Sequence, residues 1–207
     1  MQRSACKRLA IVSCVAVLGA CSTTSVEQVW RDPSKADVRM GKTLVIAVAP
    51  RNDTAVALED EWVRQLQQRG IDCRALHAVL PGEDRPDKQR VVDAVKSNAI
   101  DTVLVSRIVE KKAVQSDVPV GGPPMGSLPG YYGSWYDYYG TSRSFAGTGS
   151  YTVEREVAVL ETNLYEASSE KVFWSARSDT FLEGSAEELI RGFVEAMTKA
   201  MAKSKVL

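Results

Sequence analysis

The sequence predicts an α/β domain with a mixed sheet of about five strands and about three packed helices. Between residues 43 and 109, short apolar runs alternate with segments of helical periodicity. This order is typical of a parallel β-α-β-α-β core with right-handed crossovers. Further along, two strand-like segments, 152–166 and 172–176, flank a short turn and predict a β-hairpin. The hairpin adds antiparallel strands to the parallel core, which makes the predicted sheet mixed.

The parallel core is predicted to contain three strands and two helices. In chain order these are strand 43–49, helix 55–69, strand 71–76, a helix starting near Pro86, and strand 102–109. The first strand lacks alternation, which suits a strand covered on both faces. Leu58, Trp62 and Leu66 recur at helical spacing, and Gly70 is placed to end that helix.

The last helix is predicted from its start signal and its apolar stripe. Ser185 and Glu188 have the spacing of a capping box, in which each side chain bonds the other residue's backbone. The stripe that follows consists of Ile190, Phe193, Met197 and Met201. We expect this stripe to pack on the sheet.

The first twenty residues have the organisation of a secretory signal. Basic residues come first, an apolar run from Leu9 to Leu18 follows, and the small residues Gly19 and Ala20 precede Cys21. This ending resembles the lipobox of bacterial lipoproteins. The resemblance implies cleavage between Ala20 and Cys21, with an acylated Cys21 as the first mature residue.

An uncleaved membrane anchor is the alternative reading of this segment. A bilayer span needs ~20 apolar residues, whereas Ser13 interrupts this run. Ser22 stands where the inner-membrane retention signal of enterobacterial lipoproteins would be an aspartate, so the resemblance implies a lipid-anchored protein of the outer membrane that faces the periplasm. The chain is then expected to divide into signal peptide 1–20, lipidated tether 21–41 and a single α/β domain 42–207.

The tether is predicted to be a flexible coil. Residues 22–40 are polar, lack a sustained period and contain Pro33. A coil of that length reaches ~25 Å on average. We expect Trp30 to fold back and bury its ring on the domain, and a lipid-interface or partner anchor is the alternative.

Charge and cysteine content limit the partners. Removing residues 1–20 takes three of 26 basic residues and none of 26 acidic ones, which leaves 23 against 26. A net charge of about −3 gives no reason to expect nucleic-acid binding. Because Cys6 and Cys14 leave with the signal peptide and Cys21 carries lipid, Cys73 has no intrachain disulfide partner. We expect it to be a buried small hydrophobe, and a reactive or intermolecular thiol is the alternative.

A long segment without periodicity, residues 116–149, is the predicted binding element. It mixes tyrosine with glycine and serine, as binding loops do, because flat rings supply contact area at low entropic cost. The alternative is that the rings cover an exposed sheet edge or make no contact. The predicted partner-binding residues are Tyr131, Tyr132, Trp135, Tyr136, Tyr138 and Tyr139.

Catalytic and metal-binding patterns are absent from the sequence. His77 is the single histidine, and no cysteine or histidine pair has ligand spacing. No nucleophile elbow or phosphate-binding loop is present. The acidic runs 59–61 and 187–188 are interpreted as solvated helix ends. We therefore expect no enzyme, metal or cofactor, and a carboxylate pair brought together by folding is the enzyme alternative.

The α/β half of the chain resembles uncharacterised bacterial lipoproteins with a small α/β domain. The resemblance covers about residues 43–109 and rests on Leu58-Glu59, Leu66, Gly70-Ile71 and Asp101 to Val105 behind a lipobox. It is more remotely similar to the activators of penicillin-binding proteins and the curli-secretion lipoprotein. The resemblance lies in the sequence pattern and includes no functional motif. It implies an accessory role in the envelope.

Two classes of function follow from the aromatic segment. The first is an accessory protein that engages an envelope protein through residues 131–139. The second is a module that binds peptidoglycan or another glycan with the same rings. Asp137 is the single acidic residue among them, which favours the protein partner, because a glycan site needs several carboxylates or amides for hydroxyl groups.

Overall fold

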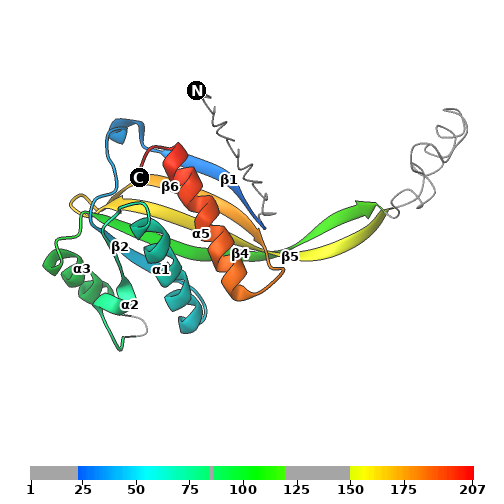
Figure 1. The fold of residues 1–207 in the computed structure, drawn as a ribbon, viewed down its shortest axis with the longest axis horizontal. Coiled ribbons are helices and arrows are strands. Elements are labelled where there is room, and N and C mark those ends of the chain that lie inside the picture. The colour runs from blue at the N-terminus through cyan, green and yellow to red at the C-terminus, as the bar shows by residue number, and fades with distance from the viewer. Residues whose placement is uncertain (1–22, 84–85, 120–149) are drawn as a thin grey trace, which may run out of the picture.

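A mixed six-stranded sheet with helices packed on it forms the body of the protein in the computed structural model (Figure 1). The structure describes residues 23–83, 86–119 and 150–207. Its elements are β1 (Thr24–Arg31), η1 (Pro33–Lys35), β2 (Thr43–Val48), α1 (Asn52–Gln67), β3 (Cys73–Ala75), α2 (Leu76–Val79), α3 (Lys88–Ser97), β4 (Thr102–Pro119), β5 (Ser150–Glu166), β6 (Lys171–Phe181) and α5 (Ala186–Lys203). The predicted α/β class with a mixed sheet is confirmed.

The strand order is β1-β6-β5-β4-β2-β3. β2 runs parallel to both of its neighbours, and Thr43 pairs with Cys73 of β3 and with Thr102 of β4. The other three pairings are antiparallel and include the predicted C-terminal hairpin, β5 with β6. β4 therefore joins the parallel and antiparallel halves of the sheet.

α3 and α5 begin with side-chain caps, whereas α1 begins at Asn52, three residues before its predicted start, without a side-chain cap. The Asp87 side chain accepts a hydrogen bond from the backbone of Arg90 at the start of α3. Ser185 and Glu188 form the predicted capping box of α5. β3 is shorter than its prediction at both ends: residues 71 and 72 precede it, and Leu76 already belongs to α2, a short helix that periodicity does not reveal.

The larger core lies between the sheet and the helices α1 and α5, which lie side by side on one face (Figure 1). Trp62 of α1 is fully buried and meets the ring of Phe193 of α5 edge-on, with centroids 6.0 Å apart. The apolar stripes of both helices thus face this core, as the sequence predicts. On the other face, Leu44 and Ile100 anchor a smaller cluster against which Val91 and Val95 of α3 pack.

The predicted flexible tether is wrong for most of its length. Residues 24–31 form β1, which pairs with β6 as the edge strand of the sheet. A register shift between Val26 and Gln28 interrupts the alternation of side chains between the two faces. The sequence therefore lacks the alternating pattern by which a strand is recognised. The α/β body therefore begins near residue 23 rather than 42.

Trp30 is folded onto the domain, but its ring is not buried as predicted. It lies on β1 opposite Ser175 of β6, and 46% of its surface is exposed. The β-ladder rather than burial of the ring holds this residue in place.

The boundary predicted at residue 116 is also wrong. Residues 116–119 continue β4, and their ladder with β5 ends at the pair Pro119 and Ser150. The stretch from Glu110 to Gln115 is mostly polar, so it carries no buried-strand signal although the backbone pairing persists. The predictions for Ala20, Cys21 and residues 131–139 fall outside the described residues.

Candidate functional site

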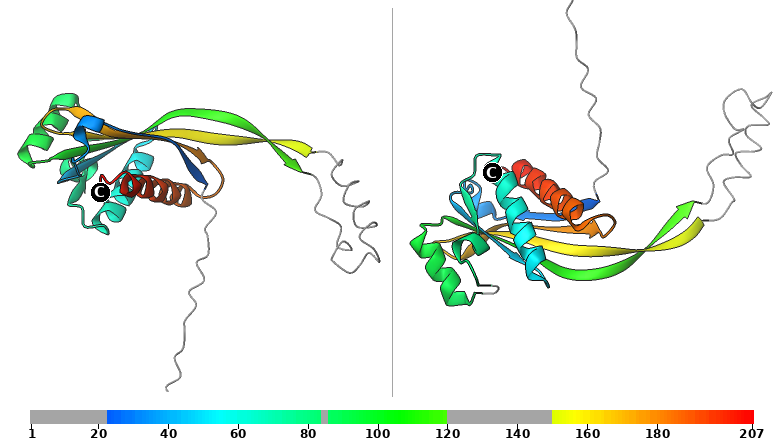
Figure 2. Two further views of the ribbon diagram at one scale, coloured as in Figure 1. Left: turned by 90° about the horizontal axis from the view of Figure 1, so that it is seen from above. Right: turned by 60° about the horizontal axis from the view of Figure 1, so that its bottom comes forward.

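The ladder of β4 with β5 extends far beyond the rest of the sheet (Figures 1 and 2). β6 ends at Phe181, opposite Val157, and β2 ends at Val48, opposite Arg107. Past Val157 the remaining pairs join residues 113–119 to residues 150–156. We call these two segments the β4–β5 arm, which is about 24 Å long at ~3.4 Å per residue.

Ion pairs fasten the base of the arm. Lys112 binds Asp179 of β6 at 2.6 Å. Arg155 pairs with Glu183 at 3.2 Å, and its guanidinium lies 5.8 Å from the centroid of the Phe181 ring. Each partly exposed pair contributes at most about 1 kcal/mol, and the two pairs link the base of the arm to β6 and to the residues just after it.

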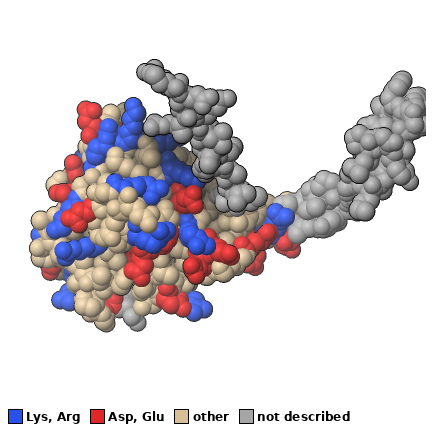
Figure 3. All heavy atoms as spheres, in the orientation of Figure 1, with Lys and Arg blue, Asp and Glu red and all other residues tan. Residues whose placement is uncertain are grey.

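The charges around the arm base are of both signs. On the face shown in Figure 3, acidic and basic side chains are intermixed where the arm begins. Glu110 lies 3.7 Å from Arg177, which adds a further opposite pair at this end of the sheet. The arm base therefore offers no field of a single sign that would select a strongly charged partner.

The arm has the physical properties of a binding element. An isolated two-stranded ribbon is marginally stable in water. Among the described residues, no further strand pairs with either outer edge of the arm. Unpaired backbone groups along an edge are a template for another strand. The arm ends at Pro119 and Ser150, the residues that border segment 120–149 with its aromatic group.

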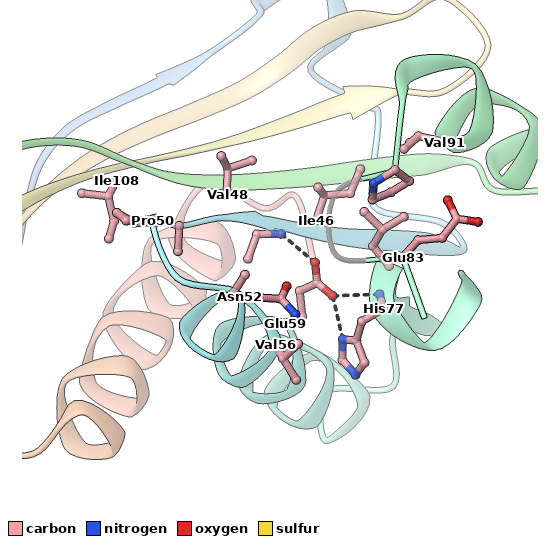
Figure 4. A pocket seen from close by; sticks show the side chains of 15 residues that line it. Ile46, Val48, Pro50, Asn52, Val56, Glu59, His77, Glu83, Val91 and Ile108 are labelled. Atoms are coloured by element: carbon pink, nitrogen blue, oxygen red, sulfur yellow. Dashed lines mark hydrogen bonds and ion pairs between the residues drawn. The ribbon is translucent and has the colours of Figure 1, made fainter. Parts of the chain in front are cut away.

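A separate cleft of about 550 Å³ opens at the carboxyl end of β2 (Figure 4). Its apolar wall includes Ile46, Val56, Val91 and Ile108. β2 lies between β3 and β4 in the sheet. The chain passes from β2 to β3 on one side and then crosses to β4 on the other side of β2. In open α/β sheets ligands bind at such switch points, so the polar groups in this cleft decide whether it has chemistry to offer.

Glu59 is the central polar group of the cleft. It is 4% exposed, and its Oε1 accepts a hydrogen bond from the Ala47 backbone N–H at 3.0 Å. Its Oε2 accepts from the His77 backbone N–H at 3.1 Å and lies 2.7 Å from His77 Nδ1. The other imidazole nitrogen, Nε2, lies 3.2 Å from Asp60 Oδ1. One carboxylate thus joins β2, α1 and α2.

The interpretation of Glu59 as part of a solvated acidic run is wrong. Glu59 is four residues after Ala55 and three before Trp62, which places it on the apolar face of α1. The helical spacing indicates that Glu59 is buried, whereas its charge alone suggests that it is exposed to solvent. Because both oxygens are engaged by the fold, we assign Glu59 a structural role. His77 is its hydrogen-bonding partner.

The structure describes no group of three or more histidine, cysteine, aspartate or glutamate side chains that could hold a metal ion, within residues 23–83, 86–119 and 150–207. In the same ranges, no helix combines the length and the apolar character needed to cross a bilayer.

Cys73 is buried, as predicted, and we expect it to be unreactive in the folded protein. Burial, and secondarily the charge of Asp72, raises the pKa of its thiol to about 11. The nucleophilic thiolate is therefore scarce at neutral pH and forms only as the pH rises toward that value. A thiol reagent should modify Cys73 of the mature lipidated protein slowly at pH 7.5 and rapidly in denaturant. Rapid labelling without unfolding would contradict this assignment.

No protein-family model and no curated protein matches this chain. Among solved structures, the PelC dodecamer from Paraburkholderia phytofirmans is 14% identical and matches 89% of this chain and 99% of that chain, with a TM-score of 0.47. Lipoprotein GNA1162 from Neisseria meningitidis is 12% identical and matches 80% of this chain and 97% of that chain, with a TM-score of 0.40. Likenesses of this size assign neither a family nor a function to this chain.

Proposed function

We propose that this protein is a lipid-anchored accessory protein of the bacterial outer membrane that binds an envelope protein through its β4–β5 arm. The proposed role is binding rather than catalysis. The lipobox at Cys21 supports the anchor. The observation that carries the binding role is the arm itself, a two-stranded ribbon that leaves the sheet and pairs with no further strand of the described residues, although the Glu156 carbonyl at its base accepts a hydrogen bond from the Leu182 backbone N–H.

The partner would gain its affinity from two sources. A strand of the partner can add to an open edge of the arm and form main-chain hydrogen bonds. The aromatic residues between the two strands of the arm, Tyr131, Tyr132, Trp135, Tyr136, Tyr138 and Tyr139, would supply anchors. The ion pairs of Lys112 with Asp179 and of Arg155 with Glu183 restrain the base of the arm, which would lower the entropic cost of binding.

We expect removal of the arm to abolish capture of the partner. In the shortened variant, Ala113 is joined to Glu156 through Asn-Gly, because these residues pair directly and a two-residue turn suits such a pair. Full-length and shortened proteins are expressed in the envelope, crosslinked and purified. A partner crosslinked to arm peptides should be recovered with the native protein and lost with the shortened one.

Two further variants identify the contact. Replacing Tyr131, Trp135, Tyr136 and Tyr138 together by alanine should also remove the partner. Trp30→Ala removes an exposed ring elsewhere on the sheet and should leave capture unchanged. A partner that is retained by the shortened protein contradicts the proposal. Arm-dependent retention on peptidoglycan sacculi, without a crosslinked protein, would favour a glycan ligand instead.

A further inference from the structure

The sheet begins almost immediately after the proposed lipid attachment site. Ser22 alone separates Cys21 from Thr23. Thr23 already accepts a hydrogen bond from the backbone N–H of Phe181, and the Thr24 hydroxyl lies 2.9 Å from that of Thr180. Two residues span at most ~7 Å. A lipid on Cys21 would therefore hold this corner of the sheet at the bilayer surface.

The register places this corner at the arm's end of the sheet. Thr24 pairs with Thr180, Thr180 pairs with Ala158, and Ala158 pairs with Lys111, so these four residues form one row across the sheet. β1 runs away from the arm, and β4 continues past this row to Pro119. The arm thus leaves the sheet at the same level as Thr24, which lies close to the proposed lipid attachment site. Figure 2 shows the start of β1 at this end of the sheet.

The arm cannot pass into the hydrocarbon core. Its outer edges carry backbone groups that no described strand satisfies, and each such group costs several kcal/mol in lipid. Its exposed side chains include Gln115, Glu154 and Glu156. An arrangement that keeps Thr23 at the surface, and the arm outside the hydrocarbon, has the strands inclined along the membrane plane.

We propose that the arm lies along the periplasmic leaflet of the membrane that holds the lipid, in contact with its headgroups. This inference rests on the lipidation of Cys21 that the proposed function includes. Along the arm and its base, residues 110–119 and 150–156, three basic residues stand against four acidic ones, which are Glu110, Asp117, Glu154 and Glu156. The contact therefore does not depend on anionic lipid, and its cause is the short connection to Cys21.

A fluorescence quenching experiment tests this orientation. The lipidated protein is reconstituted into phosphatidylcholine vesicles that contain a headgroup-labelled quencher lipid. A fluorophore is attached to Gln115→Cys on the arm or, as the matched control, to Lys171→Cys at the far end of β6; both native side chains are exposed. The native Cys73 is buried and does not interfere.

We expect several-fold stronger quenching at position 115 than at position 171. A twenty-residue Gly-Ser insertion before Thr23 reaches ~25 Å, so it should remove this difference. Equal quenching at the two positions, or stronger quenching at position 171, overturns the orientation. Protein that does not float with the vesicles contradicts the lipid anchor and both proposals. Arm-dependent capture of a partner without quenching at position 115 overturns the orientation alone.

Discussion

Replacing Glu59 with alanine is expected to lower the free energy of unfolding by about 3 kcal/mol. The change removes the acceptor of the buried Ala47 backbone N–H and of the His77 backbone N–H, together with the contact to His77 Nδ1. A buried donor that has lost its acceptor is still shielded from water, so no hydrogen bond offsets the cost of its desolvation. Chemical denaturation of the two proteins, with equal slopes against denaturant, measures the difference.

Two neighbouring variants show whether position and charge matter. Asp60→Ala removes the next acidic residue of α1, whose side chain is 63% exposed, and should cost less than about 1 kcal/mol. Glu59→Gln keeps one acceptor oxygen and should cost an intermediate amount. If Glu59→Ala were no more destabilising than Asp60→Ala, Glu59 would not hold β2, α1 and α2 together.

Phe193→Ala is expected to destabilise the protein by about 3–5 kcal/mol. The Phe193 side chain is 1% exposed and lies edge-on to Trp62, so its removal leaves a cavity between α5 and α1. The lost transfer free energy and the cavity both lower the stability. Thermal or chemical unfolding followed by circular dichroism measures the change.

Lys199→Ala is the matched control on the same helix. The Lys199 side chain is 70% exposed and pairs with Glu195 across one turn, so its loss should cost less than about 0.5 kcal/mol. A similarly small cost for Phe193→Ala would mean that α5 does not belong to the cooperative core.

The regular elements could be predicted because their local signals agree with their burial. The apolar run at Thr43–Val48 is a strand with buried residues on both faces. Leu58, Trp62 and Leu66 mark the buried face of α1. In both cases the apolar residues that form the sequence pattern are the residues that the fold buries, so the pattern predicts the element.

The missed features depend on distant parts of the chain. β1 is a strand because β6 offers it an edge, and the irregular register at Val26 hides that pairing from any period. The outer half of β4 is polar and is a strand only because β5 pairs with it. Glu59 is buried because Ala47 and His77 supply its donors. Helical spacing places Glu59 on the buried face of α1, but the donors that pair with it lie on β2 and α2 and have no local signal in the sequence.

The pairing of β1 with β6 also sets the order in which the chain can assemble. The Thr24 and Thr180 hydroxyls that meet across these strands are 156 residues apart in the sequence. The first strand to leave a ribosome or a translocation channel must therefore wait for nearly the last one. Contacts of such separation form slowly. Until β6 arrives, β1 lacks the strand with which it pairs, and unpaired strands of this kind make folding intermediates prone to aggregation.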